Sequence, residues 1–272
     1  MRTLRGPTSI VSSMMPIRLV GALITAALTV GVTGCGPVAQ TIDEISRAAE
    51  DGSGLPVVSV ERPDESLAGD VVVANAAHSV VKIESIAQSC QKILEGSGFV
   101  FAPNRVMTNA HVVAGAESVT VSVDGQEHDA RVVAFDPNAD ISILDVPGLQ
   151  APTLDFAHGV VLTGTDAVVL GYPGGGPFVA HPARVREVLE LNGPDIYRTT
   201  TVRREVYTIR GEVGQGDSGG PLIDREGRVL GMNFGAAVDD PETGFVLTTN
   251  QVYPHAVGSV ATEPVPTGEC VA

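Results

Sequence analysis

The stretch Gly214-Gln215-Gly216-Asp217-Ser218-Gly219-Gly220-Pro221-Leu222 places one serine between glycines, immediately before an apolar run that is typical of a strand. Glycine allows backbone conformations closed to other residues and lets the chain approach a substrate closely. In such a turn the amides of Gly216 and Ser218 can converge on one point near the Ser218 hydroxyl. That geometry holds the oxyanion of a tetrahedral acyl intermediate. Because serine is a poor nucleophile near neutral pH, the stretch predicts a base and its orienting acid elsewhere.

The base is expected in Thr108-Asn109-Ala110-His111-Val112-Val113, which runs from a predicted strand into a single helical turn. A lone histidine beside an apolar run is usually structural. The combination of this motif with the downstream serine motif indicates instead that His111 is the general base. We interpret the remaining histidines as structural or surface residues: His78, His128, His158, His181 and His255.

The segment Asp136-Pro137-Asn138-Ala139-Asp140-Ile141 offers two carboxylates as the orienting acid. Asp136 precedes proline and is better explained as a turn-forming residue. Asp140 enters an apolar strand, where an unpaired buried carboxylate would be costly. It therefore needs a partner, and an imidazole N–H fits. Asp145, further along the strand, is expected to face solvent.

Composition favours an all-β domain. The 272 residues include 31 glycines and 18 prolines, and valine-rich segments alternate with polar residues. We expect strands at Val80–Ile86, Gly96–Phe101, Val119–Val123, Ala130–Phe135, Thr165–Gly171, Ala183–Leu191, Thr199–Gly211, Arg228–Phe234 and Gly244–Thr249, and a short C-terminal helix within 249–260. The net charge of −15 excludes nucleic acid as a partner. Most of the arginines at 184, 186, 203 and 204 are expected on a solvated face.

The N-terminal segment is typical of export. Arginines without acids precede the apolar segment Leu19–Val32, which is shorter than the about 20 residues of a transmembrane helix. It ends in Val32-Thr33-Gly34-Cys35, which resembles a bacterial lipobox. We therefore expect residues 1–35 to be a signal peptide whose Cys35 is lipidated, with translation starting at Met14 or Met15. A plain secretory signal with an incidental Cys35 is the alternative.

Residues 36–68 are rich in Pro, Ser, Gly and acidic residues, which predicts a flexible linker to a domain at 69–272. Cys90 and Cys270 remain within that domain. Because an exported chain meets an oxidising compartment, they are expected to pair. Neither has a Cys or His at metal-ligand spacing, so we expect no metal, and no other cofactor is indicated.

His111, Asp140 and Ser218 follow one another in the chain order of chymotrypsin-like serine proteases. The motifs around His111 and Asp140 also resemble bacterial HtrA/Deg proteases. Those around Gly171-Tyr172-Pro173-Gly174-Gly175-Gly176 and Gly193-Pro194-Asp195-Ile196-Tyr197 more closely resemble the periplasmic domain of mycobacterial acid-resistance proteases.

The resemblance implies two six-stranded antiparallel β-barrels with the active site between them, and a disulfide between Cys90 and Cys270. By position after the serine motif, Phe234, Gly235 and Ala236 line the primary substrate pocket. Their types suggest no buried acid for Arg or Lys recognition, although Glu212 leaves that open.

In trypsin-like enzymes the residue at Asp217 pairs with a newly made N-terminus. The segment around Asp70-Val71-Val72-Val73 lacks the corresponding cut site. An internal arginine or backbone donors are therefore expected to satisfy Asp217.

These features predict a serine endopeptidase that cleaves extracytoplasmic proteins or peptides, tethered to the outer face of the cell membrane by lipid or else secreted. A retired protease fold that only binds other proteins is the alternative from another class. A serine esterase would share the mechanism and differ in substrate.

Overall fold

The structure is a computed structural model that describes residues 58–237, 240–258 and 261–271. The predicted signal peptide, Cys35 and most of the predicted linker lie outside these residues. No helix among the described residues is long and apolar enough to cross a membrane.

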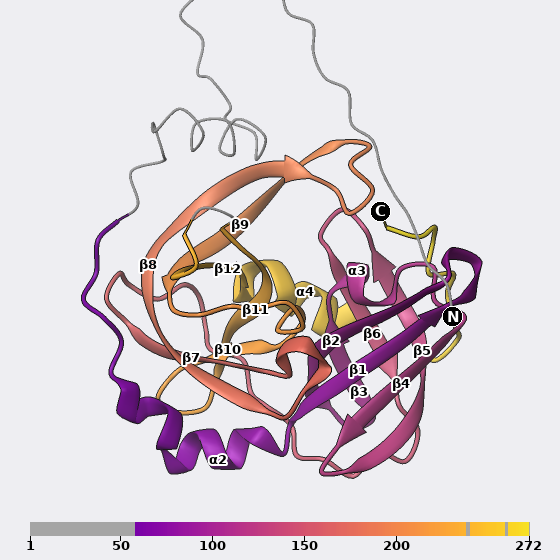
Figure 1. Ribbon diagram of the computed structural model, residues 1–272, viewed down its shortest axis with the longest axis horizontal. Coiled ribbons are helices and arrows are strands. Elements are labelled where there is room, and N and C mark those ends of the chain that lie inside the picture. The colour runs from indigo at the N-terminus through magenta and orange to yellow at the C-terminus, as the bar shows by residue number, and fades with distance from the viewer. Residues whose placement is uncertain (1–57, 238–239, 259–260, 272) are drawn as a thin grey trace, which may run out of the picture. The chain divides into compact units, whose positions relative to one another are not determined.

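The first half of the domain forms a closed six-stranded antiparallel barrel with strand order β1-β2-β3-β6-β5-β4 (Figure 1). Its strands are β1 (Val80–Ala87), β2 (Lys92–Ala102), β3 (Arg105–Thr108), β4 (Ser118–Val123), β5 (Gln126–Asp136) and β6 (Ile141–Asp145). Alternate valines of β4 point inward, as the pattern at 119–123 predicts. Asp124 and Gly125 join β4 to β5 with φ of 48° and 76°, the left-handed pair that a two-residue hairpin turn requires.

The second half forms another closed barrel of order β10-β11-β12-β9-β8-β7. Its strands are β7 (Asp166–Gly171), β8 (Val179–Pro194), β9 (Thr201–Arg210), β10 (Pro221–Ile223), β11 (Val229–Ala236) and β12 (Thr243–Thr248). The predicted all-β fold of two six-stranded barrels is confirmed. The serine motif is the connection between β9 and β10.

The buried core consists of three apolar clusters, one inside each barrel and one shared by the two barrels. Val81, Ile83 and Val121 belong to the interior of the first barrel, and Val169 and Ile209 to that of the second. The third cluster combines residues of both barrels: Phe99, Met107, Ile141, Leu170, Ile223 and Met232 are among its buried members. Burial of apolar surface between the barrels therefore fixes how the two halves of the site meet.

In the described part of the chain, six helical segments accompany the barrels. They are the 3₁₀ turns η1 (Glu65–Gly69), η2 (Gln88–Cys90) and η3 (Pro173–Gly175) and the helices α2 (Val71–Ala77), α3 (Ala110–Val113) and α4 (Thr249–Gly258). The Asp70 side chain caps α2 by accepting from the Val72 amide at 2.9 Å. The C-terminal helix predicted from the sequence is α4, which contains Pro254. Its Val252 lies in the cluster shared by the barrels, and Tyr253 packs edge-on against Phe156.

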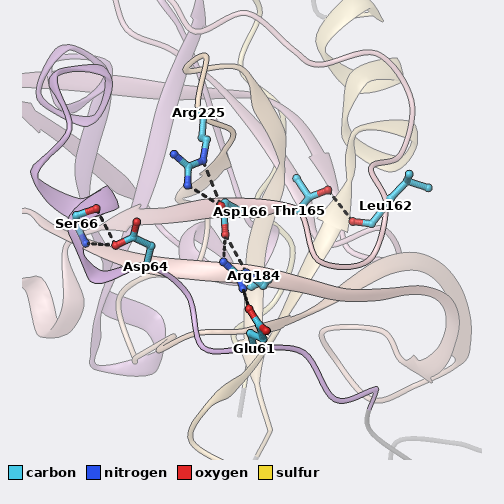
Figure 2. Close-up of polar contacts among 8 residues, drawn as sticks. All are labelled: Glu61, Asp64, Ser66, Leu162, Thr165, Asp166, Arg184 and Arg225. Carbon is cyan, nitrogen blue, oxygen red and sulfur yellow. Dashed lines mark hydrogen bonds and ion pairs between the residues drawn. The ribbon is translucent and has the colours of Figure 1, made fainter.

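Arginines of the second barrel hold the first described residues of the chain. Arg186 and Arg210 donate to the carbonyls of Val58 and Val60 at 3.1 and 2.8 Å. Figure 2 shows Asp166 of β7 accepting hydrogen bonds from Arg184 and Arg225, while Arg184 also reaches Glu61.

The expectation that most of the arginines at 184, 186, 203 and 204 face solvent is wrong. Arg186 and Arg204 are only 7% and 4% exposed, and the side chain of Arg184 is largely buried. Of the four, Arg203 is the exposed one, where it pairs with Glu190. Their neighbours explain the burial, because carbonyls and carboxylates from other segments accept hydrogen bonds or pair with the guanidinium groups.

Asp145 is also buried, at 8% exposure, contrary to the expectation that it faces solvent. It pairs with Arg105, its cross-strand neighbour in the β3–β6 register. The partner lies forty residues earlier in the chain and is adjacent only in the folded sheet.

Candidate active site

His111 and Asp140 face each other at one end of the first barrel. The His111 ring nitrogen Nδ1 lies 2.8 Å from one Asp140 carboxylate oxygen, and the His111 backbone amide donates to the other at 3.0 Å. Asn109, which begins the α3 turn, donates its side-chain amide to the Asp140 carbonyl at 2.8 Å. The Asp140 side chain is 6% exposed. The buried aspartate therefore has the imidazole partner that its position at the strand entrance requires.

Two opposing effects act on the pKa of His111. Burial disfavours the charged ring, but the nearby Asp140 carboxylate and its hydrogen bond outweigh that effect and raise the pKa above its usual value of 6.5. The positive charge of Arg204 opposes the rise in the His111 pKa. The Asp140 contact also requires the proton of a neutral ring to sit on Nδ1, which leaves Nε2 free to accept another proton.

The serine motif forms a tight loop that packs against β2 and β3. Gly216 and Gly219 have φ of 97° and 86°, conformations that other residues rarely adopt. A Cβ at Gly219 would lie 2.3 Å from the Thr108 hydroxyl and 3.1 Å from the Asn109 amide. The serine loop therefore touches the segment that leads directly into His111, and glycine is required for that approach.

Ser218 is anchored by its backbone. Its carbonyl accepts from the Ser97 amide of β2 at 2.9 Å. Within the described residues, no hydrogen bond joins the Ser218 hydroxyl to the His111 ring, and such bonds are often long in the absence of substrate. The structure thus brings His111 and Asp140 into direct contact and Ser218 into the adjoining loop.

The amides of Gly216 and Ser218 were predicted to bind an oxyanion. Neither donates a hydrogen bond to another group in the described part of the chain. The Gln215 carbonyl, which belongs to the same peptide unit as the Gly216 amide, accepts from the Gly174 amide at 2.7 Å. Both amides therefore keep an unused donor within the described part of the chain, which the predicted oxyanion hole requires.

Asp217, next to the serine, is fully buried. One carboxylate oxygen accepts from the Gly214 amide at 2.8 Å, and the other has no partner among the described residues. Of the two expected kinds of partner, the backbone donor is present. Burial raises the pKa of Asp217, and the Gly214 hydrogen bond and the charge of His181 only partly oppose the rise.

The three residues predicted for the substrate pocket lie at the end of β11. Phe234 is half-buried and its ring packs against Phe245, with centroids 6.3 Å apart. Gly235 has open space where a side chain would be, and Ala236 is exposed. Glu212 is 77% exposed and lies 3.6 Å from His181, at a cavity of about 340 Å³ that includes none of these three residues.

Cys90 and Cys270 are joined by a disulfide, with Cα atoms 6.2 Å apart. The bond ties the C-terminal tail to the first barrel. The tail is also held by backbone hydrogen bonds, from Val265 to the Val132 carbonyl and from Gly115 to the Thr267 carbonyl. Gly115 follows the α3 turn closely, so the tail supports the segment that carries His111.

Sequence reasoning missed two buried residues beside the site. Arg204 of β9 donates to the Asn138 and Pro194 carbonyls at 2.9 and 3.1 Å, and so holds the turn before Asp140 from the other barrel. Ser97 connects β2 to the serine loop. The small residues of Gly96-Ser97-Gly98 indicate that another backbone segment approaches this strand closely. They do not indicate that this segment is the serine loop.

Comparison with known proteins finds similar chains among serine proteases. Residues 96–232 match the trypsin-like peptidase domain family. Serine protease Rv3671c of Mycobacterium tuberculosis is 56% identical over 223 residues, which are 82% of this chain and 56% of that relative. This chain therefore spans little more than half of the relative's length. A protein of Halomonas elongata named probable periplasmic serine endoprotease DegP-like is 34% identical over 145 residues. These residues are 51% of this chain and 28% of that relative.

Solved structures give the same result. The crystal structure of Rv3671c protease from M. tuberculosis in its active form matches with a TM-score of 0.79 at 57% identity, covering 80% of this chain and 96% of that one. The inactive form of Rv3671c protease matches with a TM-score of 0.68 at 54% identity, covering 75% of this chain and 100% of that one. The expected resemblance to the mycobacterial protease and, more distantly, to DegP-like proteases is confirmed.

Proposed function

This chain belongs to the trypsin-like peptidase family, and from that premise we propose that it is a serine endopeptidase acting through a Ser218–His111–Asp140 triad. The observation that carries the proposal is the hydrogen-bonded His111–Asp140 pair beside the glycine-rich loop of Ser218. A fold retained only for binding would have no need of that buried pair, because burying a carboxylate is costly.

In the proposed mechanism the Ser218 hydroxyl attacks a peptide carbonyl while Nε2 of His111 takes its proton. The amides of Gly216 and Ser218 bind the oxyanion. Collapse of the tetrahedral intermediate breaks the C–N bond, and His111 gives the proton to the leaving amine. Water then attacks the acyl-enzyme by the same route and releases the acid. Asp140 keeps the His111 proton on Nδ1 and stabilises the imidazolium that forms.

The primary substrate pocket is proposed at Phe234, Gly235 and Ala236. The open space at Gly235 leaves room for a substrate side chain, and an aromatic wall favours an uncharged one. Glu212 points to solvent at a different cavity, which argues against a buried acid for Arg or Lys.

We further propose that the enzyme acts outside the cytoplasm on protein or peptide substrates, held at the membrane by a lipid on Cys35. Support comes from the lipobox-like sequence, the disulfide and the periplasmic name of the DegP-like relative. A Cys35→Ser variant should be released from membranes or retained as an unprocessed precursor. Fractionation and an N-terminal mass identical to wild type would contradict the anchor.

Labelling with a fluorophosphonate probe tests the activity. Wild-type protein should gain one adduct at Ser218, and Ser218→Ala should gain none. Hydrolysis of a peptide substrate by the same two proteins separates an endopeptidase from an esterase that cleaves only activated esters. Absence of labelling in folded wild type would favour the binding protein, and equal labelling of both proteins would reject Ser218.

A further inference from the structure

Ser97 is a fully buried serine in β2, and it contacts the serine loop in two ways. Its backbone amide donates to the Ser218 carbonyl at 2.9 Å. Its hydroxyl donates to the Gly216 carbonyl at 2.7 Å. The two loop carbonyls flank Asp217, so one residue of the first barrel fixes the backbone on both sides of it.

The Ser97 hydroxyl has a single possible orientation. It accepts from the Tyr172 amide at 2.9 Å, and its one hydrogen is committed to Gly216. A Cβ at Gly171 would lie 3.0 Å from this oxygen, so the space around it is filled. The hydroxyl therefore joins the serine loop to the loop that follows β7, a loop that includes the 3₁₀ turn η3 (Pro173–Gly175).

That second loop controls a peptide unit of the proposed oxyanion hole. The Gly174 amide donates to the Gln215 carbonyl at 2.7 Å. In a trans peptide the N–H points away from the C=O, so this bond turns the Gly216 N–H away from Gly174. The Ser97 hydroxyl thus holds Gly216 in two ways. It binds the Gly216 carbonyl directly, and through the Tyr172 amide it holds the loop whose Gly174 amide binds the Gln215 carbonyl.

Ser97 also connects to the half of the site that contains the base. Its carbonyl accepts from the Thr108 hydroxyl at 2.7 Å. Thr108 immediately precedes Asn109, whose side chain holds the Asp140 carbonyl. These hydrogen bonds, together with the peptide bond between Thr108 and Asn109, therefore link Asp140 of the first barrel through Ser97 to the serine loop of the second.

We propose that Ser97 is a positioning residue: its hydroxyl orients the Gly216 amide toward the oxyanion and sets the serine loop against the His111 half of the site. This inference rests on the proposed peptidase function. Ser97 does not touch the substrate. It acts through Gly216, so its loss should weaken transition-state stabilisation more than substrate binding.

Ser97→Ala tests the proposal, with Ser85→Ala as a matched control. Ser85 is a fully buried serine of β1 in the same barrel, and its hydroxyl has no hydrogen-bond partner among the described residues. With a peptide substrate, Ser97→Ala should lower kcat by about 10-fold or more and change KM by less than about threefold, since removal of an oxyanion donor outright costs roughly 100- to 1000-fold. Affinity for a peptide aldehyde, which forms a tetrahedral adduct, should fall in parallel with kcat/KM. Ser85→Ala should resemble wild type.

A purely structural role predicts a different result: a lower thermal midpoint with kcat and aldehyde affinity unchanged, which would overturn the proposal. If Ser97→Ala fails to fold, Thr108→Val removes the donor to the Ser97 carbonyl instead. An unchanged kcat in that variant would also overturn it, and a lower kcat at constant KM would support it. An inactive and unlabelled wild type would reject the proposed function itself, whereas an active wild type with unchanged Ser97→Ala rejects only this inference.

Discussion

Asp140 and Asp217 are both buried carboxylates next to a proposed catalytic residue, yet their surroundings differ. Asp140 accepts from the ring and the backbone of His111, and Asn109 holds its carbonyl. Asp217 accepts one backbone hydrogen bond and leaves its other oxygen without a partner among the described residues. A paired carboxylate orients its neighbour, whereas an unpaired one costs stability when it ionises. The first barrel therefore holds His111, the proposed base, in a fixed position. The second barrel supplies a serine loop that depends on contacts from other segments, such as Ser97.

Replacing Asp140, the better hydrogen-bonded of the two carboxylates, with Asn should have the largest effect on activity. The amide would hold the wrong tautomer of His111, and kcat should fall by about 10⁴-fold. Peptide hydrolysis at saturating substrate measures the loss, and circular dichroism verifies the fold. Asp136→Asn is the matched control, since Asp136 caps its own turn through the amides of Asn138 and Ala139. Equal losses in the two variants would contradict the assignment of Asp140.

Removing the disulfide tests whether the His111 half depends on the C-terminal tail. Cys90→Ser should lower stability by about 2–5 kcal/mol, because the bond closes a loop of 180 residues. Turnover should fall by a larger fraction than the content of secondary structure. The Thr267 carbonyl of the tail holds Gly115 just after the α3 turn, which contains His111. Activity and circular dichroism on oxidised, reduced and Cys90→Ser protein measure both. Equal activity in all three samples would exclude a functional role for the bond.

The pH dependence of kcat/KM reports the His111 side directly. Only neutral His111 can accept the Ser218 proton, and Asp140 raises the pKa of His111 above 6.5. Activity should therefore fall about tenfold per pH unit below a midpoint that lies above this value. In Asp140→Asn the residual activity should have a lower midpoint, because the carboxylate that raises the pKa is gone. An unshifted midpoint would assign the titration to another group.

Asp217→Asn sharpens the other side of the comparison and should have the smallest effect. Because burial raises the pKa of Asp217 in the folded state, its contribution to stability is full below the ordinary value of 3.8 and is lost as pH rises through the raised pKa. An uncharged Asn avoids that loss and should raise the thermal midpoint of the domain at pH 7. The gain should vanish below pH 3.8. A destabilised variant at pH 7 would show that the carboxylate is needed in its charged form.

The sequence could predict those parts of the site that depend on local requirements. A carboxylate entering an apolar strand needs a partner, and the motif around His111 indicates which histidine provides it. Glycines around Ser218 indicate a tight loop, and Asp124-Gly125 specifies its hairpin. These inferences need only the neighbours in the chain.

Contacts between distant segments could not be predicted in this way. Ser97 meets Gly216 across 119 positions, and Arg204 meets Asn138 across 66. Burial of Arg204 is tolerable only because carbonyls of two other segments accept its hydrogen bonds, and those become neighbours when the barrels pack. Asp145 was misjudged for the same reason, since Arg105 lies beside it only in the folded sheet.

The central claim is that Ser218 of the second barrel and His111 of the first act as one catalytic unit. The most direct measurement is kcat for one peptide substrate in Ser218→Ala, His111→Ala and the double variant. Each single change should lower kcat by up to about a million-fold, and the double variant should be no worse than either, because neither residue works without the other. Losses that multiply in the double variant, or substantial hydrolysis by Ser218→Ala, would contradict the account.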